Sequence, residues 1–331
     1  MTYQDFPKIV LFAPGRIKRY PRSTMARFYT RVYEALQENG YRSVIKHKPY
    51  KVPEQNGLFY LTYHTIVNRP DILNVKGGYL HDYMLLDEAG YSGWASVVDS
   101  EPEWMNVDGL EAQEFAKALR KRYIDAGLAR YHRMSEKTEQ NIPDGYVAIY
   151  LQCQDDTVMT LRRFETEEMV RAIIAQRGDR AVVIKRHPLC ESPEIAALLD
   201  EVVDPEAGVF QSQENVHDIS ARASAVACVN SGAGFDSLLH GRKVMVFGVS
   251  DYRHAAFEIT DLAQVGEVIE GPGHDASTIS RYLYWYLNRR SVHVDSPDLG
   301  KLVIKRIRAR NGVEHATPRA WERFPPNKNA A

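Results

Sequence analysis

The sequence predicts an α/β fold with two domains. Short apolar runs of strand length alternate with segments of helical periodicity from one end of the 331-residue chain to the other, a pattern typical of α/β architecture. A chain of this length has room for two domains of ordinary size, each with its own core. The polar segment 135–145 contains Pro143 and lacks periodicity, so it is the predicted linker. Two halves of similar size then predict two Rossmann-like domains facing across a cleft.

The predicted elements follow in chain order. In the first half we expect strands at 9–13, 43–46 and 58–63, and helices at 23–38 and 110–126. In the second half we expect strands at 146–151, 181–184, 225–229 and 244–247, and helices at 165–176, 193–199 and 216–223. Strands separated by helices run parallel, so the second half predicts a parallel sheet. The predicted domains are residues 1–140, residues 141–275, and a helical, basic C-terminal region, 276–331, that packs back on the first domain.

The composition excludes several classes of protein. Charged residues make up 26% of the chain, apolar residues 44%, and the formal net charge is -1, so a general nucleic-acid binder is not expected. No apolar run approaches the roughly 20 residues that span a bilayer, and the N-terminal residues lack the order of a secretion signal. Three widely spaced cysteines predict neither a disulfide framework nor a metal site. We therefore expect a cytoplasmic protein.

The strongest local signal lies between residues 225 and 252. An apolar strand leads into Asn230-Ser231-Gly232-Ala233-Gly234, and a short helix follows. Ser231 can cap that helix, while Gly232 and Gly234 let backbone N–H groups approach an anion at its positive end. The turn lacks the spacing of a P-loop or of the full G-x-G-x-x-G pattern. Alone, it fits either a phosphate cradle or an ordinary strand-to-helix turn.

Two further loops of the second half also follow predicted strands and carry polar residues. They are 151–157 and 184–188, and the Ser231 turn is the third member of the set. The carboxyl ends of parallel strands share one edge of a sheet, which is where open α/β folds bind ligands. The ordered set of three loops therefore predicts one site beside the interdomain cleft.

The residue types in these loops indicate anion chemistry. Lys185, Arg186 and His187 supply cationic or donor groups suited to a phosphate or a carboxylate. Asp155 and Asp156 supply carboxylates that can act as base or nucleophile, with a helix N-cap or a solvated loop acid as the alternative. The histidines show none of the close spacings of a zinc site. We therefore expect a metal-independent mechanism.

At these residues the sequence resembles the capsule-synthesis family of bacterial β-Kdo glycosyltransferases. The family pattern is Gln-x-x-x-Asp after a strand, then Lys-x-His-Pro, then Asn-Ser-x-x-Gly with a following Leu-x-x-Gly, and finally an Asp/Ala-x-Tyr loop. The matching residues, in order, are Gln152 and Asp156, Lys185, His187 and Pro188, Asn230, Ser231 and Gly234, and Leu238 and Gly241. The adjacent residues Asp251 and Tyr252 stand at the place of the final loop. The resemblance is specific for the second domain.

The resemblance implies a GT-B glycosyltransferase that uses CMP-β-Kdo with retention and transfers Kdo to a capsule or O-antigen glycan. By position, Asp156 would be the nucleophile that forms a glycosyl-enzyme adduct. The predicted catalytic set is Asp156, His187 and Gln152. The predicted donor-binding set is Lys185, Arg186, His187, Asn230, Ser231, Gly232, Gly234, Asp251 and Tyr252. No metal and no cofactor is expected, because CMP-Kdo is a substrate.

The first domain departs from the capsule pattern. Capsule enzymes usually have an acidic pair before Gly-Tyr/Phe-Leu-Arg, whereas this chain has Lys76-Gly77-Gly78-Tyr79-Leu80-His81 and later Asp87-Glu88. This segment is closer to the O-antigen branch of retaining β-Kdo transferases. His81, Asp87 and Glu88 are the candidates for general acid or base on the acceptor side. Trp94 fits either an acceptor or sugar pocket or an ordinary buried turn.

Other functions fit the same residues. The Lys/His/Ser anion site suits another CMP-sugar enzyme, such as a sialyltransferase-like GT-B protein, a UDP-sugar enzyme, or a non-catalytic glycan-binding GT-B scaffold. The expected partners are a CMP-sugar donor and a glycan or lipid-linked glycan acceptor. From Lys301 onward, basic residues surround Leu302, Val303, Ile304 and Ile307. This end either contacts the anionic inner-membrane surface, making the protein peripheral, or docks as a helix on the first domain.

Overall fold

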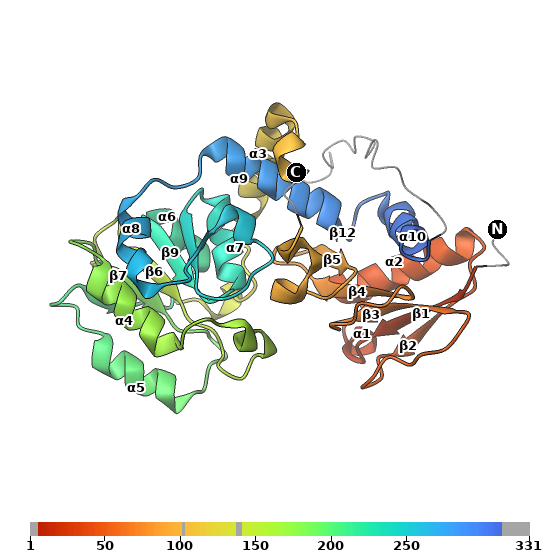
Figure 1. Ribbon diagram of the computed structural model, residues 1–331, viewed down its shortest axis with the longest axis horizontal. Helices are drawn as coiled ribbons and strands as arrows, with labels where there is room; N and C mark the ends of the chain where they lie inside the picture. Colours follow the sequence, from red (N-terminus) through yellow and green to blue (C-terminus); the bar gives the residue numbers. More distant parts are fainter. Residues whose placement is uncertain (1–5, 101–102, 137–140, 313–331) are drawn as a thin grey trace. The chain divides into compact units, whose positions relative to one another are not determined.

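Two α/β units, each built on one six-stranded sheet, make up the chain (Figure 1). The computed structural model describes residues 6–100, 103–136 and 141–312. Unit 1 comprises Met1–Ser100 and Trp285–Ala331, and unit 2 comprises Glu101–Tyr284. The predicted fold class, with two Rossmann-like domains, is confirmed in each unit.

The boundaries of the units differ from the predicted ranges. Helix α3 (Gly109–Tyr123) belongs to unit 2, because it packs on α7 (Gly232–Leu239) and the Arg120 guanidinium donates to the Leu239 carbonyl at 2.7 Å. The polar segment around 135–145 therefore connects two parts of unit 2. At the other end, the chain returns to unit 1 only at Trp285, the last residue of α9 (Ala276–Trp285).

Unit 1 has a mixed sheet with the strand order β12-β5-β4-β3-β1-β2. Its strands are β1 (Lys8–Ala13), β2 (Ser43–His47), β3 (Leu58–Tyr63), β4 (Ile72–Gly77), β5 (Tyr83–Asp87) and β12 (Ser291–His293). The first four are parallel, whereas β5 runs antiparallel to β4, and β12 antiparallel to β5. Its helices are α1 (Arg16–Arg19), α2 (Thr24–Glu38), a π-helix (Tyr286–Arg290) and α10 (Leu299–Arg310).

Helices α2 and α10 lie side by side and cover the main core of unit 1 (Figure 1). Leu299, Val303 and Ile307 recur at helical spacing along α10 and are all buried in this core. Gly300 is required where the helices meet, because a Cβ there would overlap the side chain of Ala35 in α2. The predicted return of the C-terminal helix to the first domain is confirmed. The basic tail beyond residue 312 lies outside the described residues.

Unit 2 has an all-parallel sheet with the order β11-β10-β9-β6-β7-β8. Its strands are β6 (Val147–Tyr150), β7 (Val182–Lys185), β8 (Val209–Gln211), β9 (Ala225–Cys228), β10 (Lys243–Val246) and β11 (Phe257–Glu258). Its other helices are α4 (Thr166–Gln176), α5 (Pro193–Val202), α6 (Val216–Arg222) and α8 (Val265–Glu270). This is the strand order of a classical dinucleotide-binding sheet.

Helices cover both faces of the second sheet. Ile149 and Leu151 pack with residues of α4, α5 and α8 in one core cluster. Tyr150 points to the opposite face, because side chains alternate along a strand, and its hydroxyl is 2.7 Å from Ser220 Oγ of α6. The chain changes direction across the sheet between β6 and β9, and ligands bind at such switch points in open α/β sheets. Among the described residues, no helix is long and apolar enough to cross a membrane.

Candidate functional site

The three polar loops predicted from the sequence meet at the carboxyl edge of the second sheet. β6 pairs with β7 on one side and with β9 on the other, so the loops that follow these strands are neighbours. The first loop carries Gln152 to Asp156, the second Lys185 to His187, and the third the turn at Ser231. The structure therefore brings the core of the predicted site together at the topological switch point.

Gln152 and Asn230 form a reciprocal pair that ties two of these loops. Gln152 Nε2 donates to Asn230 Oδ1, and Gln152 Oε1 accepts from the Asn230 backbone N–H, both at 2.9 Å. Asn230 Nδ2 also donates to the carbonyls of Val158 (3.0 Å) and Val249 (3.3 Å). Both side chains are buried. Their polar groups are thus used inside the protein, and we assign both residues a positioning role.

Asp156 is exposed at the end of the first loop. Its Oδ1 accepts from the Val158 N–H at 3.3 Å and caps the short 3-10 helix Thr157–Leu161. The helix N-cap role, which the sequence left open as an alternative for this aspartate, is therefore present, and it uses one of the two carboxylate oxygens. The same charge acts on His187, whose pKa it raises against the effect of burial. Asp156 is therefore an oriented carboxylate within electrostatic reach of the second loop.

His187 is half-buried between the first and second loops. Its Nδ1 accepts from the Leu189 N–H at 3.2 Å and lies 3.1 Å from the Sγ of Cys153. The ring of Tyr131 meets it edge-on, with the ring centroids 4.8 Å apart. Burial lowers the pKa of His187, and the charges of Arg130 and Lys185 lower it further. Burial and these cations therefore favour the neutral imidazole.

The two cationic side chains of the second loop, Lys185 and Arg186, differ in their contacts within the protein. Burial lowers the pKa of Lys185, while Glu214 and Glu136 oppose that shift. Arg186 donates through Nη2 to the Ser192 carbonyl at 2.9 Å, which closes the loop before α5. Arg186 therefore holds the loop itself, whereas the Lys185 ammonium has no hydrogen bond or ion pair among the described residues.

The buried side chain of Tyr252 holds the backbone of the Ser231 turn in place. Ser231 Oγ accepts from the Ala233 N–H at 3.2 Å and caps α7, and the Tyr252 hydroxyl donates to the Ser231 carbonyl at 2.7 Å. Gly234 is required here, because a Cβ would lie 2.5 Å from that hydroxyl and 2.9 Å from Cys228 Sγ. Tyr252 is fully buried, so it shapes the turn without facing solvent. Gly232 is the first residue of α7.

Asp251 is also buried, and its carbonyl accepts from the Tyr282 hydroxyl at 2.8 Å. The adjacent pair Asp251-Tyr252, predicted to bind the donor, therefore anchors a loop inside unit 2. Sequence reasoning had no means of separating this role from ligand contact, because both produce the same motif.

Sequence reasoning missed Asp236, a buried carboxylate on α7. Burial raises the pKa of Asp236 to about 7, while the charge of Arg130 lowers it. Arg130 acts on His187 as well, so it links this helix to the second loop electrostatically. A signal was present in the sequence, because Asp236 is the only ionisable residue of the otherwise small and apolar helix Gly232–Leu239.

The predicted acceptor-side residues lie in unit 1 at both ends of β5. His81 precedes this strand, is 60% exposed and contacts Asp82 at 3.0 Å through Nδ1. Asp87 ends the strand and is followed by Glu88 and the loop that carries Trp94. Five residues of strand separate the two places by about 15 Å at the usual rise. The structure therefore does not bring His81 together with Asp87, Glu88 and Trp94.

Asp87 is the hub of its loop. Its Oδ1 accepts from the backbone N–H groups of Ala89, Gly90 and Ser96 at 2.8 to 3.0 Å. Its Oδ2 accepts from Ser96 Oγ at 2.8 Å and from Arg290 Nη2 at 2.5 Å. The side chain is fully buried. Asp87 therefore positions the loop, whereas the neighbouring Glu88 is 37% exposed and its Oε2 accepts from Ser96 Oγ at 3.1 Å and lies 3.5 Å from Arg290 Nη2.

This loop forms one wall of a pocket of about 370 Å³. The pocket is lined by Ile66, Asn68, Ala89, Gly93, Trp94, Ala95, Ser96 and Asp99. The half-buried Trp94 packs edge-on against Tyr91, with centroids 5.6 Å apart. One aromatic ring, an exposed isoleucine and polar side chains together make a lining of the mixed kind that small-molecule sites use.

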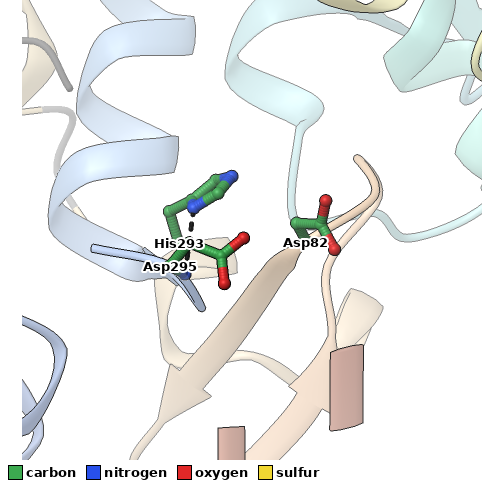
Figure 2. A group of neighbouring side chains, drawn as sticks. All are labelled: Asp82, His293 and Asp295. Atoms are coloured by element: carbon green, nitrogen blue, oxygen red, sulfur yellow. Dashed lines mark hydrogen bonds between the residues drawn. The ribbon is translucent and has the colours of Figure 1, made fainter. Parts of the chain in front are cut away.

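A group of possible metal ligands also lies in unit 1 (Figure 2). Asp82, His293 and Asp295 each place one ligand atom within 4.8 Å of the others. Arg27 already pairs with both carboxylates, and His293 Nδ1 accepts from the Asp295 N–H at 3.2 Å. These contacts describe an ion-pair cluster around Arg27. No group of this kind was found in unit 2 within the part of the chain that the structure describes.

One comparison bears directly on the three loops. Residues 106–263 match the family model of capsule polysaccharide biosynthesis proteins. The match starts near the beginning of unit 2 and includes all three loops and Asp251-Tyr252. The predicted resemblance to the capsule-synthesis family is therefore confirmed for this segment. No curated protein matches the chain.

The capsule-synthesis likeness extends to the fold. The β-Kdo 2,4-transferase of Thermosulfurimonas dismutans KpsC matches with a TM-score of 0.53 and 15% identity, covering 83% of this chain and 89% of that chain. The β-Kdo 2,7-transferase of the same protein matches with a TM-score of 0.52 and 12% identity, covering 92% and 99%. At these identities the likeness shows a shared fold, and the predicted GT-B class is confirmed.

Proposed function

We propose that this protein is a retaining glycosyltransferase that transfers Kdo from CMP-β-Kdo to a bacterial surface glycan. One observation carries the proposal: the segment that matches the capsule-synthesis family folds so that Asp156, Lys185, His187 and Ser231 meet at one edge of a parallel sheet. The shared fold with two β-Kdo transferases supports the choice of sugar.

The proposed roles follow from the availability of each side chain. Asp156 is exposed, oriented by its cap on Val158, and is the proposed nucleophile. Its carboxylate attacks the anomeric carbon and forms an ester to Kdo, and the bond to the CMP phosphate oxygen breaks. The acceptor hydroxyl then displaces Asp156, and the two inversions give net retention.

The leaving group needs neutral and positive donors. Departing CMP carries a phosphate whose charge increases as the bond breaks, and preorganised donors stabilise such charge. Lys185 supplies a cation, His187 a neutral N–H, and the first turn of α7 after Ser231 supplies backbone N–H groups. Gln152 and Asn230 hold these loops in register, and no metal is required by this set.

Intact-protein mass spectrometry tests the proposal. After incubation with CMP-β-Kdo, the wild-type protein gains the mass of one Kdo unit, and Asp156→Asn does not. Asp155→Asn is the matched control, because Asp155 is the adjacent exposed aspartate and should keep the adduct. CMP release without any adduct would contradict the nucleophile, and neither release nor adduct from a folded protein would contradict the donor.

Donor competition separates the remaining enzyme classes. CMP-Kdo should displace a labelled CMP from the protein, whereas CMP-sialic acid and UDP-sugars should not do so at the same concentration. Equal displacement by CMP-sialic acid would favour a sialyltransferase-like enzyme. Tight CMP-Kdo binding without turnover, with every acceptor offered, would favour a non-catalytic scaffold.

We also propose that the pocket beside Trp94 binds the acceptor sugar. The ring of Trp94 can stack on the apolar face of a pyranose, and Asn68 and Asp99 can bind its hydroxyl groups. Glu88, a partly exposed carboxylate on the same loop, is the proposed base for the acceptor hydroxyl. Trp94→Ala should raise the KM for acceptor at least tenfold and leave hydrolysis of CMP-Kdo in the absence of acceptor unchanged.

Contact with an anionic inner membrane remains a separate proposal. The apolar residues of α10 are buried in the core of unit 1 or packed against it, so the support comes mainly from basic residues such as the exposed Lys301 and Lys305. Binding to vesicles with anionic lipid should then depend strongly on salt. The absence of binding at low salt would remove the proposal.

A further inference from the structure

The contact between Cys153 and His187 joins the loops after β6 and β7. Cys153 Sγ lies 3.1 Å from His187 Nδ1, and the Leu189 N–H donates to the same Nδ1 at 3.2 Å. A backbone N–H is always a donor, so Nδ1 must present its lone pair. In the neutral ring the proton then sits on Nε2.

The role of the Cys153 thiol as a donor follows from the protonation of the His187 ring. Because Nδ1 carries no hydrogen, Cys153 can hydrogen-bond to it only by donating its S–H. Burial raises the pKa of the Cys153 thiol and so keeps that proton in place. Two donors from two segments therefore converge on one nitrogen.

We propose that Cys153 is a positioning residue that, together with the Leu189 amide, holds His187 as a neutral donor with its proton on Nε2. Among the described residues, Nε2 has no hydrogen-bond partner, so its N–H is available to a ligand. The inference deepens the proposed function, and only its last step rests on that function: the Nε2–H is the group that donates to the anionic part of the CMP-sugar.

The arrangement also opposes protonation of the ring. An imidazolium carries a hydrogen on both nitrogens, and a hydrogen on Nδ1 would point at the Leu189 N–H and the Cys153 S–H. The charged groups that act on the ring are Asp156, which favours the imidazolium, and Arg130 and Lys185, which oppose it. The ring of Tyr131 covers one edge. Loss of the thiol donor should therefore make protonation easier.

Nitrogen-15 NMR of histidine-labelled protein tests the proposal without any donor sugar. His187→Gln assigns the signal, and the wild-type shifts should be those of the Nε2–H form. Cys153→Ala should raise the pKa of His187 by about half a unit to one unit, the shift expected when the neutral form loses one hydrogen bond. Cys153→Ser keeps a donor and should restore the wild-type pKa.

Cys190→Ala is the matched control. Cys190 is also half-buried, and its backbone rather than its thiol contacts His187, so its removal should leave the His187 pKa unchanged. A wild-type Nδ1–H form, or an unchanged pKa in Cys153→Ala, would overturn the proposal. In a transfer assay, the acid limb of the pH profile should move with the NMR pKa. If CMP-Kdo proves not to be the donor, that assay fails while the NMR result stands.

Discussion

The two units hold their candidate functional loops in place with different chemistry. In unit 1, five donors converge on the buried charge of Asp87, and Arg290 neutralises it. In unit 2, the neutral amides of Gln152 and Asn230 do the equivalent work by spreading their hydrogen bonds over several loops. The first and third loops of unit 2 are therefore joined through neutral amides rather than through a buried ion pair.

Removal of the Asp87 carboxylate should have the largest effect on the stability of the protein. Asp87→Ala leaves Arg290 with only its longer 3.5 Å contact to Glu88, and it leaves three backbone N–H groups without their acceptor. Breaking a buried pair in this way typically costs about 3–5 kcal/mol. Hydrogen exchange should show residues 88–98 opening, and calorimetry should show a lower melting temperature. Asp99→Ala, an exposed acid in the same loop region, is the control. Unchanged exchange in Asp87→Ala would show that the loop is held by other contacts.

A second buried carboxylate sharpens the comparison, because Asp236 lacks the donors that surround Asp87. No described residue donates a hydrogen bond to it, and burial raises its pKa from 3.8 to about 7. The folded protein therefore holds this proton more tightly than the unfolded chain, so the contribution of Asp236 is complete below pH 4 and is lost as pH rises through about 7.

Asp236→Asn should remove that pH dependence. At 1.36 kcal/mol per pKa unit, the variant should be roughly 2–4 kcal/mol more stable than wild type at pH 8, with little difference near pH 4. Urea unfolding at both pH values measures the difference. His240→Gln, at the C-cap of the same helix, is a control with the opposite slope, because burial lowers the pKa of His240 to about 4. Equal stability of wild type and Asp236→Asn at pH 8 would mean that the carboxylate is solvated.

Breaking the pair formed by Gln152 and Asn230 should lower the stability of the protein less than removing Asp87. Asn230→Ala keeps the backbone N–H that donates to Gln152 Oε1 but leaves the buried Gln152 Nε2 without its acceptor, a loss of about 1–3 kcal/mol. The double variant with Gln152→Ala should be less destabilised than the sum of the two single variants, because each residue satisfies the other. Gln154→Ala is the control, because it loses hydrogen bonds with Thr166 and with the Gln152 carbonyl but leaves the side-chain pair of Gln152 and Asn230 intact. Additive effects in the cycle would show that the pair is not coupled.

The sequence was most informative about unit 2. Parallel strands buried on both faces are continuous apolar runs, so β6, β7, β9 and β10 lie within one or two residues of their predicted ranges. Their chain order also placed the three loops on one edge. The order of the strands could not predict which side chains bind each other and which face a ligand. The pairing of Gln152 with Asn230, for example, depends on side-chain geometry across the switch point.

Unit 1 was harder to predict, because the strands that were not predicted from its sequence form through contacts with distant parts of the chain. β4 contains Asn74, which is buried and accepts from Thr65 while donating to Val67 and Asp87 carbonyls. β12 has only three residues and is a strand through its pairing with β5. Neither partner is visible from the local sequence. The hub role of Asp87 was missed for the same reason, since Arg290 lies far along the chain.

The division of unit 1 into two chain segments has a consequence for biosynthesis. Unit 2 is continuous, so the ribosome delivers all of it before β12, α10 and Arg290 emerge. Until then Asp87 has no counter-ion, and burying it would leave an uncompensated charge. We expect nascent chains released after residue 284 to contain a protease-resistant second unit and an incomplete first one. The acceptor-side loop would therefore be the last part of the protein to acquire its final structure during translation.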